Sequence, residues 1–407
     1  MGRQVNAWLF LASVSVTAIG LVGLAAEWYL RTTVPVDWTQ EYRIPHPVLG
    51  WTLAAGSKYT TYVPEPVDVS YNSEGWRDIE PITRLDAEFR VAILGDSFIE
   101  AYSVDQVESF SSRFDALIKS RGQDGEVFNF GVGGYSTFQE YLAYKQIAPI
   151  YRPQLVLLGF YLGNDVRNND LRLESIVNTD QVKVESRPFL TINSSGDRSV
   201  TAVAIAEAKK QYEFERARRE EWPLRDARKS VLLRVLGRTV RRLQGRLMNR
   251  GTTGESVTDR NELVEVSRFG VHFCEEPPEI SSAWEVTTSV LEQFRNEVQA
   301  NGAQLVVFSV PAAEEVEIFR MEARLATVAR AEQICFERAP GYRRLKAVLD
   351  SLGIESVDLL PAFRDAARKE SATLFRGDGH WAPMGHALAA DVVFGELHQR
   401  QLLSNGF

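Results

Sequence analysis

The chain has 407 residues, of which 44% are hydrophobic and 25% are charged, and its formal net charge is -8. This length and composition fit one large α/β domain with additions, or two modest domains, and exclude a disordered chain. The acidic balance argues against nucleic acid as a partner, because nucleic-acid binding normally requires a basic surface.

The N-terminal segment is the first predicted element. Residues 5–26 carry no charge, and roughly 20 apolar residues are enough for a helix to cross the hydrocarbon core of a membrane. We therefore expect residues 1–31 to form a single-pass anchor, with the rest of the chain facing outward. A cleaved signal peptide, ending at the small residues of positions 23–26, and a buried core helix are the alternatives.

Residues 32–88 form a region that is rich in proline, tyrosine and tryptophan. Its prolines interrupt regular helix, so we expect an extended, strand-like extension. Arg77 follows a polar turn in this region. A structural ion pair is the favoured interpretation of Arg77, and a side chain that reaches an active cleft is the alternative.

The first predicted strand is the apolar run 91–94, which ends at Gly95-Asp96-Ser97. In open α/β sheets, active groups follow the carboxyl ends of parallel strands, in the loops that lead into helices. Ser97 is therefore the candidate nucleophile. The alternative interpretation is that Gly95 and Asp96 only form a tight turn.

Two similar units follow. A strand at residues 127–130 precedes a glycine loop at 131–137, and a strand at residues 154–160 precedes Asn164. Helices are predicted between these strands, at residues 109–118 and 137–150. This alternation is typical of a parallel sheet with helices on both faces.

The alternation stops in the region 170–280 and then resumes. The later predicted elements are helices at 283–300 and 342–352, strands at 304–310 and 356–360, and a final helix at 383–402 that begins at a proline. The sequence therefore predicts one α/β domain over residues 89–404, interrupted by an insertion at 170–280.

A candidate general base precedes the final helix. His380 stands two residues after Asp378 in a glycine-containing loop, which is a favourable setting for a histidine that accepts a proton. His386 is the reserve candidate, but it lies inside the predicted helix, where packing or capping is the expected role.

Four loops stand in the order that defines the SGNH hydrolases, also called the GDSL superfamily. They carry Ser97, Gly134, Asn164 and the Asp378-Gly-His380 triplet, and the resemblance covers most of residues 89–169 and 281–404. It implies a three-layer α/β/α flavodoxin-like parallel sheet, here with an N-terminal transmembrane helix and a largely helical insertion. It implies no cofactor.

The resemblance also implies a role for each of these residues. Ser97 resembles the nucleophile and His380 the general base, while the backbone N–H groups of Ser97 and Gly134 and the side-chain amide of Asn164 resemble an oxyanion hole. The family usually has its aspartate three residues before the histidine, whereas Asp378 stands two before it. In an extended loop the Asp378 carboxylate could still hold the imidazole, and a backbone carbonyl is the alternative.

The function that we expect is that of a serine esterase, in which water resolves an acyl-Ser97 intermediate. Acetyl esters of envelope glycans are the favoured substrates, because the anchor and the extension resemble a bacterial, envelope-associated branch of the superfamily. The alternatives are O-acyl transfer to exported polysaccharide, a lysophospholipase, and an inactive glycan-binding protein. The expected location is the bacterial inner membrane, with the catalytic domain facing the periplasm or the cell exterior.

The insertion contains a basic stretch. Nine arginines or lysines and one aspartate occur in residues 225–250, and residues 230–250 are predicted to form a basic amphipathic helix. The helix would either lie on anionic lipid head groups or pack on the domain with a solvated face. The insertion could also form a lid or rim that selects the substrate.

The chain has two cysteines, Cys274 and Cys335. Their spacing does not match a zinc site, so no structural metal is expected. Outside the cytoplasm the two could form a disulfide. The sequence leaves this open, because it does not show how close their Cα atoms come.

Overall fold

The structure is a computed structural model. It describes residues 18, 20–29, 42–62, 66–80, 87, 89–122, 124–178, 184–193, 195–201, 203–220, 257–369 and 372–403. The predicted anchor at 5–26 lies mostly outside these residues, and the predicted basic helix at 230–250 lies wholly outside them. No helix among the described residues is long and apolar enough to cross a bilayer.

The centre of the fold is a parallel sheet of five strands. Its order is β11-β10-β7-β5-β6, and all neighbouring strands run parallel. The strands are β5 (Phe89–Leu94), β6 (Gly125–Asn129), β7 (Leu155–Tyr161), β10 (Gln304–Val310) and β11 (Glu355–Val357). Counted along the chain this is the order 2-1-3-4-5 of flavodoxin-like sheets. The predicted α/β class with a parallel sheet is confirmed.

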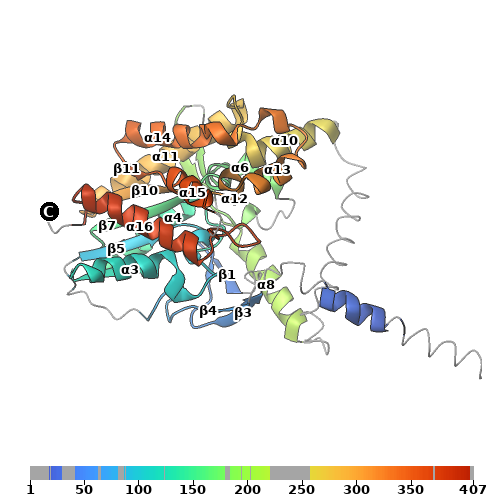
Figure 1. Cartoon of the computed structure of the whole chain (residues 1–407), viewed down its shortest axis with the longest axis horizontal. Helices are drawn as coiled ribbons and strands as arrows, with labels where there is room; N and C mark the ends of the chain where they lie inside the picture. Colours follow the sequence, from blue (N-terminus) through green and yellow to red (C-terminus); the bar gives the residue numbers. More distant parts are fainter. Residues whose placement is uncertain are drawn as a thin grey trace, which may run out of the picture.

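Helices cover both faces of this sheet. α3 (Phe110–Ser120) packs against α16 (Pro383–Gln399), and α4 (Thr137–Tyr151) packs against α11 (Pro278–Ala300). The connections through α3 and α4 cross the sheet in opposite directions, so right-handed crossovers place these two helices on opposite faces. Figure 1 shows α3 and α16 side by side, and α14 (Pro340–Leu352) near β11.

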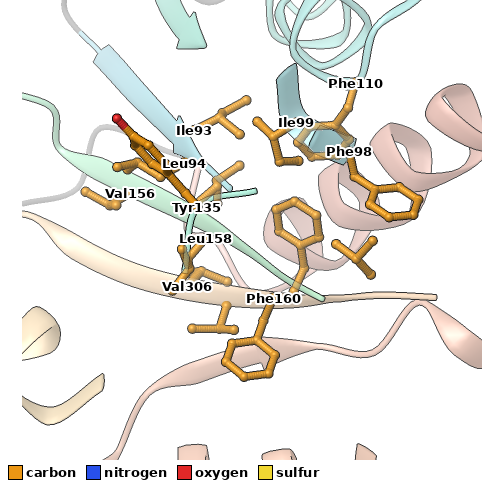
Figure 2. Packing of buried hydrophobic residues seen from close by; sticks show 14 of the residues in the cluster. Ile93, Leu94, Phe98, Ile99, Phe110, Tyr135, Val156, Leu158, Phe160 and Val306 are labelled. Carbon is orange, nitrogen blue, oxygen red and sulfur yellow. The ribbon is translucent and has the colours of Figure 1, made fainter. Parts of the chain in front are cut away.

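The core lies where the sheet meets the helices, because the central strands bury nearly every residue. All seven residues of β7 except Tyr161 are buried. Figure 2 shows aliphatic side chains of β5, β7 and β10 beside aromatic rings. The residues labelled there are Ile93, Leu94, Phe98, Ile99, Phe110, Tyr135, Val156, Leu158, Phe160 and Val306. The sheet therefore offers rigid strand ends from which loops can project.

The N-terminal extension forms two antiparallel hairpins, as its extended character predicts. They are β1 (Arg43–His46) with β2 (Gly50–Leu53), and β3 (Lys58–Tyr62) with β4 (Pro66–Ser70). Side chains of the main domain hold the first hairpin: Tyr135 donates to the carbonyl of Trp51 at 2.6 Å, and Gln139 donates to that of Leu49 at 2.7 Å. The hairpin is therefore attached next to the glycine loop.

The described part of the insertion is mainly helical. It contains α6 (Leu171–Val177), the hairpin of β8 (Leu190–Ile192) and β9 (Arg198–Val200), α8 (Ile205–Glu220), α10 (Val257–Phe269) and the 3-10 turn η4 (Gly270–His272). α11 begins at Pro278, so the regular α/β pattern resumes five residues before the predicted start of that helix.

Several short elements differ from the prediction. The strand predicted at 356–360 ends at Val357, because the side chain of Asp358 accepts the N–H of Leu360, the first residue of α15 (Leu360–Ala367), at 3.0 Å. Elements that the pattern did not predict, or left unbounded, are α2 (Ser97–Glu100), α5 (Asp165–Asn169), α12 (Ala313–Val316), α13 (Ile318–Leu325), α15 (Leu360–Ala367), η2 (Gln106–Glu108), η5 (Ala331–Gln333) and η6 (Phe336–Arg338).

The two cysteines form a disulfide. The Cα atoms of Cys274 and Cys335 are 5.1 Å apart. The two segments are also paired by backbone hydrogen bonds, from Cys274 N–H to the carbonyl of Gln333 at 2.7 Å and from Cys335 N–H to the carbonyl of His272 at 2.8 Å. The bond that the sequence left open is thus present, and it fixes the start of α11 to the segment before α14.

Candidate active site

The candidate residues follow three neighbouring strands of the sheet. Ser97 follows β5, the glycine loop with Gly134 follows β6, and Asn164 follows β7. Because β5 lies between β6 and β7, the carboxyl ends of these strands bring the three loops to one edge. The strand order reverses between β5 and β7, which is where ligands bind in open α/β sheets.

Ser97 is the first residue of α2, a four-residue helix. Asp96 caps this helix by accepting the N–H of Phe98 at 2.9 Å. Glycine at position 95 lets Ile99 of this helix pack against the strand ends, because a Cβ there would lie 3.0 Å from the Cβ of Ile99 and 3.3 Å from the carbonyl oxygen of Gly159. The turn therefore holds Ser97 at the strand end, where its side chain remains partly exposed.

The imidazole of His380 lies against this serine. Its Nε2 atom is 2.9 Å from Oγ of Ser97, and its Nδ1 atom is 3.0 Å from Oδ2 of Asp378. The rings of Phe98 and Tyr102 border the imidazole, each with a centroid distance of 5.0 Å. The structure therefore brings Ser97, His380 and Asp378 into one hydrogen-bonded chain.

The contact between Asp378 and His380 forms in a tight turn rather than in the extended loop expected from the sequence. Gly379 N–H donates to the carbonyl of Arg376 at 3.0 Å, and Gly379 has a φ of 92°. This left-handed conformation suits glycine. The Asp378 carboxylate reaches the imidazole and also accepts the backbone N–H of His380, at 3.1 Å. A carboxylate, not a backbone carbonyl, thus lies at Nδ1.

The charge of Asp378 suits this contact. Burial acts to raise the pKa of its carboxyl group, but the hydrogen bonds and positive charge of His380 outweigh it and hold the pKa below its ordinary value. Asp378 is therefore an anion at neutral pH. An anion there favours the imidazole tautomer that carries its proton on Nδ1 and leaves Nε2 free to accept one.

The predicted oxyanion donors lie around the same serine. A Cβ on Gly133 would lie 3.6 Å from Cβ of Ser97, so the glycine loop lies directly beside the serine. The side-chain amide of Asn164 donates to Oδ2 of Asp96 at 2.7 Å. An amide carries two N–H groups, so one remains for a substrate oxygen. No described residue accepts the N–H of Ser97 or Gly134.

Two other sequence candidates have structural roles. His386 is 1% exposed and accepts the N–H of Phe110 through Nδ1 at 3.3 Å, and burial lowers its pKa to about 3. It packs in α16 and has no contact with Ser97. Arg77 is 2% exposed and donates to backbone carbonyls, including that of Val104 at 2.5 Å. The ion pair predicted for Arg77 is wrong, because its partners are carbonyls.

Sequence reasoning missed the residues of the first hairpin that border the site. Arg43 lies over the ring of Trp51, with 5.8 Å from its Cζ to the centroid. Its Nη1 atom would lie 3.5 Å from a Cβ on Gly134. Among the described residues, Nε of Arg43 and Nε1 of Trp51 have no acceptor. The density of aromatic residues in the extension was the available signal, but it did not indicate which of them face the site.

Sequence reasoning also missed Tyr71 and Glu100. Glu100 is buried three residues after the serine, and the hydroxyl of Tyr71 donates to it at 2.6 Å. A carboxylate in the otherwise apolar stretch from Phe98 to Ala101 was the signal in the sequence. No group of three or more His, Cys, Asp or Glu residues in the described part of the chain could hold a metal ion.

The sheet order and the site geometry define an α/β domain that carries a hydrogen-bonded serine, histidine and aspartate. In a comparison with family models, residues 274–406 are similar to the SGNH hydrolase-like domain of the acetyltransferase AlgX. The matched residues make up about a third of the chain. The matched part includes Asp378 and His380 and does not reach Ser97.

Comparison with curated protein sequences gives no match. Among solved structures, the chain is similar to the acetyl xylan esterase AlAXEase, at 10% identity and a TM-score of 0.36 over 76% of this chain and 100% of that one. It is also similar to LAE5 from the metagenome of Lake Arreo, Spain, at 13% identity and a TM-score of 0.38 over 78% of this chain and 97% of that one.

A third similar structure is the psychrotrophic esterase EstA from Pseudoalteromonas sp. Its identity is 11% and its TM-score 0.34, over 77% of this chain and 98% of that one. At such TM-scores these structures are likenesses only.

Proposed function

We propose that the protein is a serine enzyme that acts on an ester through an acyl-Ser97 intermediate. One observation carries the proposal: the hydroxyl of Ser97, the imidazole of His380 and the carboxylate of Asp378 are linked by contacts of 2.9 and 3.0 Å. A serine hydroxyl is a weak nucleophile, and an imidazole at hydrogen-bond distance is the group that activates it.

The first half of the reaction forms the intermediate. Nε2 of His380 takes the hydroxyl proton while Oγ of Ser97 attacks the ester carbonyl carbon. The negative charge that develops on the carbonyl oxygen is stabilised by N–H groups of Ser97, Gly134 and Asn164. His380 then gives its proton to the leaving alcohol, and the acyl group stays on Ser97. Asp378 keeps the imidazole oriented throughout.

The second half repeats these steps with a different nucleophile. In the favoured reaction, water gives a proton to His380 and attacks the acyl carbon, which releases the acid and restores Ser97. The favoured substrate is an acetyl ester of an envelope glycan. The match to an SGNH hydrolase-like domain of an acetyltransferase supports a second candidate, in which a carbohydrate hydroxyl takes the place of water.

The proposed location is the cell envelope, outside the cytoplasm. The disulfide between Cys274 and Cys335 supports this, because disulfides persist mainly in oxidising compartments. The uncharged segment at residues 5–26 would anchor the domain to the inner membrane, with the catalytic domain on the periplasmic or outer side.

The test of the reaction compares the purified protein with Ser97→Ala on p-nitrophenyl acetate. We expect the substitution to reduce kcat/KM by about a thousandfold or more, because residual catalysis without the nucleophile is small. We also expect mass spectrometry to detect an acetyl group on Ser97 of the wild type and no acetyl group at position 97 of the Ser97→Ala variant. Equal rates for the two proteins would contradict the proposal.

The choice between the two acceptors requires a competition experiment. A soluble oligosaccharide is added at rising concentration while p-nitrophenol and acetate are measured separately. Hydrolysis predicts that the two products stay equal. Transfer predicts that acetate falls below p-nitrophenol and that the oligosaccharide gains an ester.

A further inference from the structure

In the glycine loop between β6 and α4, nearly all backbone N–H groups donate to acceptors elsewhere in the protein or in the loop itself. The N–H of Gly131 donates to Asn129 Oδ1 at 2.9 Å, and the N–H of Val132 to the carbonyl of Gly95 at 3.0 Å. The N–H of Gly133 donates to Oε2 of Glu100 at 2.5 Å, and that of Tyr135 to the carbonyl of Val132 at 3.1 Å. The N–H of Gly134, which has no acceptor among the described residues, is therefore left for a ligand.

The contact with Glu100 is the one in this set that depends on an ionisable side chain. Glu100 is 1% exposed and lies on α2, the helix that begins at Ser97. One carboxylate thus joins the loop that presents Gly134 to the helix that presents the nucleophile. The fit leaves no space, because a Cβ on Gly133 would lie 2.8 Å from Oε2 of Glu100.

The N-terminal extension holds this carboxylate from the other side. The hydroxyl of Tyr71, just after β4, donates to Oε1 of Glu100 at 2.6 Å. The hydroxyl of Tyr59 lies 3.2 Å from the hydroxyl of Tyr71. Arg77 donates to the backbone carbonyl of Glu100 at 3.1 Å. Side chains of the extension therefore fix both the backbone and the carboxylate of Glu100.

We propose that Glu100 is a positioning residue that, together with Tyr71, holds the glycine loop so that the N–H of Gly134 faces the carbonyl oxygen of an ester at Ser97. Glu100 does not touch the substrate. This inference rests on the proposed function, and it makes the extension part of the catalytic centre, since Tyr71 lies outside the α/β domain.

The test compares Glu100→Ala with Glu100→Gln in the full chain, with p-nitrophenyl acetate as substrate and phenylboronic acid as a mimic of the tetrahedral intermediate. Loss of one oxyanion donor lowers kcat by roughly a hundredfold or more. We expect Glu100→Ala to lower kcat about a hundredfold, to change KM by less than about threefold, and to weaken phenylboronic acid binding by a factor similar to that in kcat.

The glutamine variant separates positioning from simple stability. Its amide oxygen can still accept the N–H of Gly133 and its amide nitrogen can donate to Tyr71, so we expect it to restore most of kcat. Tyr71→Phe serves as a second variant that leaves the carboxylate in place. We expect it to lower kcat by less than Glu100→Ala, with KM unchanged.

The chain offers a matched control in Glu315. It is 6% exposed and accepts a tyrosine hydroxyl, that of Tyr342, and a backbone N–H, that of Ala312, each at 2.6 Å. It has no contact with the glycine loop. We expect Glu315→Ala to lower the thermal midpoint while the folded protein keeps the wild-type affinity for phenylboronic acid.

Two results would overturn the positioning role. One is a Glu100→Ala protein whose folded fraction binds phenylboronic acid as tightly as the wild type. The other, decisive if that variant does not fold, is a Tyr71→Phe protein that has the kcat and the phenylboronic acid affinity of the wild type. A wild type that lacks Ser97-dependent turnover would instead overturn the proposed function itself.

Discussion

Gly379 determines how the imidazole meets its carboxylate. With a φ of 92°, it reverses the chain between Asp378 and His380, so that two residues only two positions apart in sequence bond through their side chains. The contact does not need an aspartate three residues before the histidine, because the left-handed turn at Gly379 brings the Asp378 carboxylate to the imidazole. The geometry thus depends on one backbone conformation that side-chain-bearing residues rarely adopt.

We therefore expect Gly379→Ala to slow the reaction. A Cβ there meets no atom within 4 Å, so the effect comes from the backbone alone and costs about 1–2 kcal/mol of strain. If relaxation of the turn moves the carboxylate from Nδ1, kcat on p-nitrophenyl acetate falls by roughly tenfold or more.

Gly377→Ala is the matched control for this change. Gly377 lies in the same loop, also has open space at its Cβ position, and lacks a positive φ. We expect this variant to keep wild-type kcat. Equal losses in the two variants would contradict the role of the turn.

The burial of His386 predicts how the free energy of unfolding changes with pH. Burial lowers its pKa to about 3 in the folded protein, whereas a histidine in the unfolded chain has a pKa of about 6.5. The unfolded state therefore binds more protons below pH 6.5. The contribution of this group to stability is fully present above pH 6.5 and is lost as the pH falls, at about 1.4 kcal/mol per pH unit.

We expect the destabilisation caused by His386→Gln to shrink by about 2 kcal/mol between pH 7.5 and pH 5. Urea denaturation of both proteins at each pH measures the difference. Leu397→Ala, a buried position on the same helix, removes no titrating group and serves as the control. A destabilisation by His386→Gln that is constant with pH would contradict the prediction.

At the scale of elements, the disulfide joins two loops rather than two helices or strands. It lies before α11 and before α14, and the two cysteines have a sequence separation of 61. Closing a loop of this length restricts the unfolded chain, so we expect the double substitution Cys274→Ser and Cys335→Ser to lower the free energy of unfolding by about 2 to 4 kcal/mol.

Chemical reduction provides the control for this prediction. Dithiothreitol should lower the urea midpoint of the wild type towards that of the double variant and leave the variant unchanged. The reaction at Ser97 should persist at low temperature in both, since the disulfide lies outside the hydrogen-bonded chain. A wild-type midpoint unaffected by complete reduction would contradict the prediction.

The elements that carry the site were predictable where an apolar run in the sequence ends directly before a candidate residue. The apolar runs before Ser97, the glycine loop and Asn164 mark strands, and parallel strands end at a common edge. The contribution of Tyr71 was not predictable, because its bond to Glu100 depends on how a hairpin packs on the domain, and no periodicity encodes that. The end of the strand before Asp358 was missed because a local hydrogen bond from the N–H of Leu360 to the side chain of Asp358 competes with strand pairing there.

At the scale of the whole molecule, the flavodoxin-like order came from resemblance, whereas periodicity gave only the alternation of strands and helices. The structure shows what the order achieves: β5 lies between β6 and β7, so the nucleophile has a donor loop on each side. The hairpins of the extension then cover the side on which the glycine loop lies. The hydrophobic pattern did not reveal this covering, because those strands are short and only partly buried.

The order of the residues along the chain has a consequence for biosynthesis. Ser97 precedes His380 by 283 residues, so a ribosome completes the nucleophile long before it adds the base. A nascent polypeptide that still lacks residue 380 would therefore carry the serine in an inert form. Reactivity towards esters would begin only when the C-terminal part has been synthesised and has folded against the first strands.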